Sequence, residues 1–172
     1  TSGSANPDIK INSSMIGTPR SITSNGNYVM IGDENANGEC IGANGTRSTH
    51  IWTSWPTTSR DPDACVDNWV GGTIVNEKIY TIAAGGESLY FWDSLPMSTN
   101  EVSSNKILAL PGKGHKWQGG DDGGIAYANG KLFVGEYNRS VVSVYDTLPL
   151  SPDEEPDWAL GANSVNDFPL LD

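Results

Sequence analysis

The chain has 172 residues, of which 21 are acidic and 10 basic, so its formal net charge is −11. Coulomb repulsion therefore disfavours binding to nucleic acid or to an anionic membrane surface. The sequence has no apolar run near the ~18 residues that a membrane-spanning helix needs. Its 20 glycines and 10 prolines favour short strands and turns over helices.

The N-terminal phrase Pro7-Asp8-Ile9-Lys10-Ile11 shares its pattern, Pro-Asp followed three residues later by an aliphatic residue, with Pro62–Val66 and Pro156–Leu160. In both later places it opens the last strand of a repeated unit. We therefore predict that residues 1–11 form the outer strand of a sheet whose other three strands are absent. The chain starts at Thr1, from which we expect a mature or excised product.

Three units of similar pattern follow, and we predict four short antiparallel strands in each. The third predicted strand of each unit ends on an aromatic residue, Trp52, Trp92 or Tyr145, shortly before a Pro tag. A strand-rich repeat of roughly 40 to 53 residues is typical of a β-propeller blade. The predicted fold is all-β, with blades at 19–66, 72–110 and 124–161 and a truncated connector at 162–172.

Two of the units share a hairpin signal between their first and second predicted strands. Asn25-Gly26 occupies this place in the first unit and Asn129-Gly130 in the third. Both central residues of a type I′ turn need a positive φ, which Asn and Gly tolerate best. We therefore predict tight turns at both places.

The third unit resembles the repeats of NHL-type β-propellers. The resemblance lies in Ser140–Pro149, in Pro156–Gly161 and in Asn166-Asp167-Phe168, and it weakens in the earlier units, where Thr49 and Leu89 replace an arginine. It implies a propeller, usually of six blades, so we expect this chain to be a partial propeller that other chains or further blades complete. Such propellers serve as binding platforms, as surface proteins and, in some lyases, as enzymes.

The two cysteines, Cys40 and Cys65, both belong to the first unit. A disulfide between them would stabilise the fold by about 3 kcal/mol in an oxidising compartment. Two unrelated small residues are the alternative. The spacing does not match a zinc site or a haem attachment.

Propeller geometry places the loops between second and third strands beside the blade-to-blade connectors. Binding sites of propellers commonly lie on that face, although loops are also polar merely because they are solvated. The adjacent pair Asp121-Asp122 lies in an extended stretch, where neighbouring side chains point apart. The candidate ligand-binding residues are Arg20, His115, Asp121, Asp122 and Glu136, and the glycosylation sequons, no more than chance gives, are Asn12, Asn44 and Asn138.

The stretch Asp33 to Glu39 matches the start of a calcium loop, in which alternate residues supply oxygens around a Gly turn. The candidate ligands of Ca²⁺ are Asp33, Asn35, Asn37 and Glu39. Ile41 and Asn44 stand where an EF-hand would continue the ligand set, and no helices are predicted around the loop. An ordinary Asp-Asn-Gly turn is the alternative.

These features favour an extracellular, cell-surface or periplasmic module that acts in protein binding or structural assembly. The alternative is part of a metal-dependent lyase or hydrolase whose catalytic residues lie mostly on absent blades. The chain has only two histidines, His50 and His115, so it cannot build a three-histidine metal site alone. No nucleophile–base pair and no cofactor motif is visible, which argues against catalysis.

Overall fold

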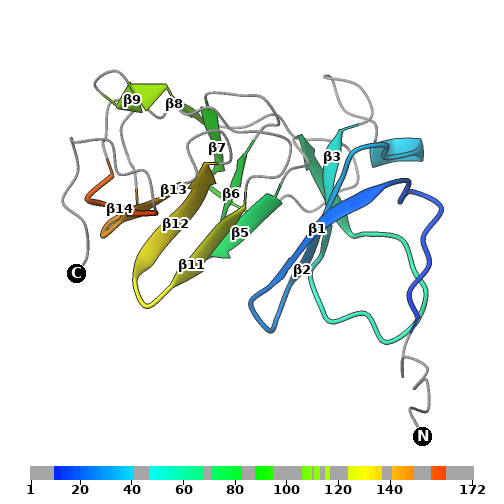
Figure 1. Cartoon of the computed structure of the whole chain (residues 1–172). Coiled ribbons are helices and arrows are strands. Elements are labelled where there is room, and N and C mark those ends of the chain that lie inside the picture. Colours follow the sequence, from blue (N-terminus) through cyan, green and yellow to red (C-terminus); the bar gives the residue numbers. More distant parts are fainter. Residues whose placement is uncertain are drawn as a thin grey trace, which may run out of the picture.

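The computed structural model describes residues 10–40, 47–67, 71–82, 88–94, 106–109, 111–112, 115–116, 124–136, 141–148 and 156–161. Within these residues the chain is all-β, and three antiparallel sheets of four strands follow one another (Figure 1). In each sheet the strands lie in chain order. The one helical segment in this part of the chain is the 3-10 turn η1 at Gly38–Cys40, so no helix there has the length or apolarity to span a bilayer.

The first sheet consists of β1 (Pro19–Ser24), β2 (Val29–Asp33), β3 (Ser48–Trp52) and β4 (Ala64–Asp67). The second consists of β5 (Gly71–Val75), β6 (Lys78–Ile82), β7 (Ser88–Trp92) and β8 (Lys106–Ala109). The third consists of β11 (Ile125–Ala128), β12 (Lys131–Glu136), β13 (Val141–Tyr145) and β14 (Trp158–Gly161). The prediction of three four-stranded antiparallel sheets is confirmed.

The segments between and before the sheets differ in part from the predictions. Residues 111–123, predicted as a connector, contain a short antiparallel pair of β9 (Pro111–Gly112) and β10 (His115–Lys116). Residues 1–9 and 162–172 lie outside the described residues. Lys10 and Ile11, the described end of the predicted orphan strand, are not in a strand.

The turns between first and second strands follow the prediction in one sheet only. Asn129 and Gly130 both have a positive φ, of 51° and 81°, as a type I′ turn requires. In the first sheet Gly26 alone has a positive φ, and the Asn25 side chain accepts hydrogen bonds from the amides of Asn27 and Tyr28. The two-residue turn predicted there was wrong, because this Asn caps a longer loop.

Each sheet has two apolar faces. We call the face on the side of the preceding sheet in the chain the leading face, and the face on the side of the following sheet the trailing face. The leading face of the first sheet carries Val29 and Trp52, which are paired across β2 and β3, and its trailing face carries the pair Met30 and Ile51. The equivalent leading pairs are Ile79–Trp92 in the second sheet and Leu132–Tyr145 in the third. The predicted equivalence of Trp52, Trp92 and Tyr145 is therefore confirmed.

The sheets stack through these faces in a repeated way. Met30 and Ile51 of the first trailing face pack in one cluster with Ile79 and Trp92 of the second leading face. Each buried apolar side chain of this size contributes roughly 1.5–3 kcal/mol. The second trailing face meets the third leading face in the same manner, in a cluster that contains Tyr80, Ile82, Leu89, Phe91, Ile125, Leu132, Val134 and Tyr145.

The repeated Pro-Asp phrase has a structural explanation. Asp63 accepts hydrogen bonds at its Oδ2 from the amide and hydroxyl of Thr53, and Asp157 accepts one at its Oδ2 from the amide of Asp146. Thr53 and Asp146 directly follow the aromatic residues that end β3 and β13. Each Asp therefore links the start of the outer strand to the end of the third strand through hydrogen bonds of its carboxylate.

Candidate functional site

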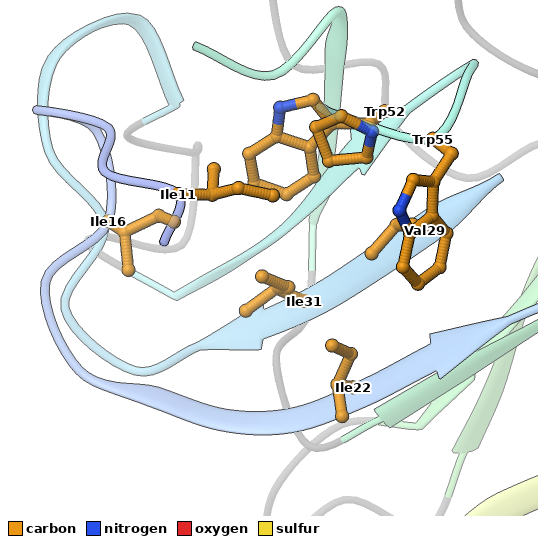
Figure 2. Close-up of a pocket in the computed structure, with 8 residues that line it drawn as sticks. Ile11, Ile16, Ile22, Val29, Ile31, Trp52 and Trp55 are labelled. Carbon is orange, nitrogen blue, oxygen red and sulfur yellow. The ribbon is translucent and has the colours of Figure 1, made fainter. Parts of the chain in front are cut away.

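The leading face of the first sheet forms an apolar groove of about 210 Å³. Side chains from β1, β2, β3 and the segment before β1 point into this common space (Figure 2). Ile22 and Trp55 are 70% and 57% exposed, which is unusual for large apolar side chains. The residues that line it are Ile11, Ile16, Ile22, Val29, Ile31, Trp52, Trp55 and Pro56.

Register shows what this groove corresponds to in the other sheets. Ile22 pairs with Ile31 in the first sheet, as Ile125 pairs with Val134 in the third. Ile125 is only 7% exposed because the second sheet covers it. The groove is therefore the position that a preceding sheet fills elsewhere in the molecule, and its chemistry suits an apolar surface.

A second feature lies beside the groove, where the chain before β1 meets the end of β2. The amides of Gly17 and Thr18 donate to Asp33 at 2.7 Å each, and the Asn35 amide donates at 3.0 Å. His50 on β3 contacts the same carboxylate, with 2.9 Å between Nε2 and Oδ2. The segment before β1 thus lies beside the loop after β2, as the sequence predicted for the face that carries the loops between second and third strands.

The fully buried pair Asp33 and His50 has shifted pKa values. Burial acts to raise the pKa of Asp33, but the hydrogen bonds from Gly17, His50, Thr18 and Asn35 lower it below its ordinary value. Burial lowers the pKa of His50, although Asp33 opposes this effect. An ionised Asp only accepts hydrogen bonds, so Nε2 of a neutral His50 carries the proton and Nδ1 keeps its lone pair.

The other ring nitrogen of His50 faces a disulfide. Its Nδ1 lies 3.7 Å from Sγ of Cys65, which is bonded to Cys40 with 5.6 Å between the Cα atoms. Both cysteines are fully buried, and Ala36 and Met15 pack around them. The pairing that the sequence left open is thereby confirmed, and a structural disulfide points to an oxidising compartment.

The predicted ligand-face residues are only partly described. Arg20 is half-exposed and its Nε donates to Glu34 at 2.9 Å. The backbone amide of Asn12, the first residue of a predicted glycosylation sequon, donates to the Ser59 hydroxyl at 3.0 Å. The backbones of His115 and Glu136 lie in β10 and β12. Outside the described residues are Asn44, Asp121, Asp122 and Asn138.

Three of the predicted calcium ligands, Asp33, Asn35 and Asn37, have described side chains. Both oxygens of Asp33 already accept hydrogen bonds, two at Oδ1 and two at Oδ2 counting the His50 contact. The Asn35 side-chain amide donates to Thr18 at 3.0 Å, and Asn37 is exposed. Glu39 lies in η1. Calcium binding here stays a prediction, and an ion would have to displace the donors of Asp33.

Sequence reasoning missed His50 as a member of this cluster. A signal was present in the sequence. His50 lies two residues before the buried Trp52 in the same strand, so the two side chains lie on the same face of the sheet. Its partners Asp33 and Cys65 come from neighbouring strands, which only the register brings opposite His50. The groove agrees in general terms with the expectation that other chains or further blades complete this one.

Comparisons with known proteins add no further identification. The chain matches no protein-family model and no curated protein.

Proposed function

We propose that this chain is a partial β-propeller of the NHL-like kind, exported from the cell, that acts in protein binding or structural assembly. Its groove accepts the trailing face of a further four-stranded sheet of the same repeat type. The observation that carries this proposal is the equivalence between the groove and the covered leading faces of the second and third sheets.

The arrangement of the innermost strands supports a propeller. Strand β5 contacts both β1 and β11, so the first strands of consecutive sheets gather together. A β-carbon on Gly71 of β5 would lie 3.8 Å from Ser21 Oγ and 3.9 Å from Ile125 Cγ2. Propeller blades are arranged in this way around a channel, with the first strand of each blade innermost.

The trailing face of the third sheet supports the choice of occupant. Phe133 and Val144 are paired there, as Met30 and Ile51 are in the first sheet. Phe133, Val142 and Leu160 are half-buried apolar residues. One end of the stack thus offers a leading face and the other a trailing face, which gives a heterologous, head-to-tail interface between two copies.

Complementary variants test this interface. Light scattering of the wild-type chain should show mass that rises with protein concentration. Ile22→Asp places a charge in the groove, and Phe133→Asp places a charge on the trailing face of the third sheet. Each variant keeps only one of the two complementary surfaces, so each alone should be monomeric. A mixture of the two retains one intact interface and should form a 1:1 dimer.

The matched control is Thr57→Asp, an exposed position outside the groove, which should associate like the wild type. Circular dichroism checks that each variant keeps its β structure. A mixture of the Ile22 and Phe133 variants that stays monomeric, together with a wild-type chain that stays monomeric at the highest concentration, would refute the proposal.

A further inference from the structure

Three potential metal ligands gather in the buried cluster beside the groove. The Sγ atoms of Cys40 and Cys65 and a ring nitrogen of His50 all lie within 4.8 Å of one another. All three residues are fully buried. In the structure the two sulfurs form a disulfide, so the donor set becomes complete only after reduction.

The His50 ring is oriented as a metal-bound imidazole is. Its Nε2 donates to the Asp33 carboxylate, which is itself fixed by the amides of Gly17, Thr18 and Asn35. Metal-ligating histidines commonly donate their second N–H to such a carboxylate, which fixes the tautomer and raises the basicity of the other nitrogen. The lone pair of Nδ1 is thereby directed at the sulfur of Cys65, 3.7 Å away.

A thioether lies next to the thiols. The Sδ of Met15 is 3.7 Å from Sγ of Cys40, and Met15 packs against the cluster from the segment before β1. Thiolate and thioether sulfurs favour Cu⁺ among the biological cations, whereas Zn²⁺ takes Cys, His and carboxylate ligands. The presence of Met15 therefore selects Cu⁺.

We propose that the reduced chain binds one Cu⁺ through the thiolates of Cys40 and Cys65, Nδ1 of His50 and Sδ of Met15. A dithiol reductant transfers two electrons and two protons to the disulfide and becomes a disulfide itself. Cu⁺ binding then releases both thiol protons to solvent, and the oxidation state of the metal does not change. The Cα–Cα distance of 5.6 Å accommodates two sulfurs that separate to roughly 3.7 Å around a metal.

The test uses the full chain, reduced with dithiothreitol and freed of it under anaerobic conditions. Competition with the chromogenic Cu⁺ chelator bicinchoninate should give one Cu⁺ per reduced chain and none for the disulfide form. His50→Gln should weaken Cu⁺ binding at least about 10-fold. Met15→Leu should weaken Cu⁺ binding by a similar factor and leave Zn²⁺ binding unchanged. His115→Gln changes the other histidine and should bind like the wild type.

X-ray absorption of the wild-type Cu⁺ complex provides a test that needs no variant. Three sulfur neighbours and one nitrogen neighbour are expected. A purely sulfur shell, an unchanged affinity in the His50 variant or equal Cu⁺ binding by the Met15 variant would overturn the proposed site. Binding by the disulfide form would overturn it too. The inference does not depend on the docking groove.

Discussion

Gly17 lies so close to Asn35 that a β-carbon on Gly17 would stand 1.9 Å from the Asn35 carbonyl oxygen. The same glycine donates its amide to Asp33 at 2.7 Å. Backbone against backbone leaves no flexible side chain to move aside. The close approach therefore ties the segment before β1 to the loop after β2, and with it one side of the disulfide cluster.

Replacing Gly17 with Ala should destabilise the chain by at least about 2 kcal/mol, because overpacking costs roughly 1–3 kcal/mol and here the clash is with main chain. Urea unfolding of the disulfide form measures the change. Gly124→Ala is the control, since its β-carbon would meet nothing within 4 Å. That variant should differ by less than about 0.5 kcal/mol. Equal stability of the two variants would contradict the close approach.

Replacing Thr81 with Val should stabilise the chain by about 1 kcal/mol. The Thr81 hydroxyl is buried between the first two sheets and has no hydrogen-bond partner among the described residues. Removing an unsatisfied hydroxyl in favour of a methyl group of the same shape recovers its desolvation cost. The equivalent positions hold Ile31 and Val134, both apolar. Thermal unfolding measures the change, and a loss of stability would show that the hydroxyl has a partner.

The Pro-Asp phrase should contribute stability that depends on pH. Burial acts to raise the pKa of Asp63, but hydrogen bonds from Arg60 and Thr53 lower it below its ordinary value. A lowered pKa in the folded state means that the contribution is complete above the unfolded pKa of about 3.9. It is lost as the pH falls through the folded value.

Asp63→Ala should therefore cost about 1 kcal/mol at pH 7, and the difference from wild type should shrink as the pH falls below about 4. Urea unfolding between pH 7 and pH 2.5 measures this difference. Asp157→Ala removes the equivalent hydrogen bond in the third sheet and should also destabilise at pH 7. A cost for Asp63→Ala that is constant across this pH range would contradict the assignment to an ionised carboxylate.

The sequence predicted the sheets well because their signals are local. The aromatic ends of the third strands and the Asn129-Gly130 turn depend on neighbouring residues only, and both have the predicted structure. The short loop at Asn76-Glu77, where φ is 49° and 64°, was not predicted as a type I′ turn, because Glu seldom adopts this conformation.

The buried cluster was predicted only in its parts. Asp33 was interpreted from the spacing of its own loop, whereas its partners Gly17 and His50 lie 16 and 17 residues away. Such contacts depend on the register of the strands and on the path of the segment before β1. Neither can be derived from the spacing of residues within one loop. The disulfide remained one of two possibilities for the same reason, since Cys40 reaches Cys65 through η1 and the pairing of β3 with β4.

The face-to-face order of the sheets makes stability a nearest-neighbour quantity. The second sheet shares an apolar interface with each of the others, so it cannot open without losing both. The outer sheets can open locally at the cost of one interface each, and a sheet docked on either end would suppress that opening. Amide hydrogen exchange should therefore be slowest in β6 and β7. Assembly would act on this chain chiefly by protecting the first and third sheets from local opening as well as the second sheet is protected.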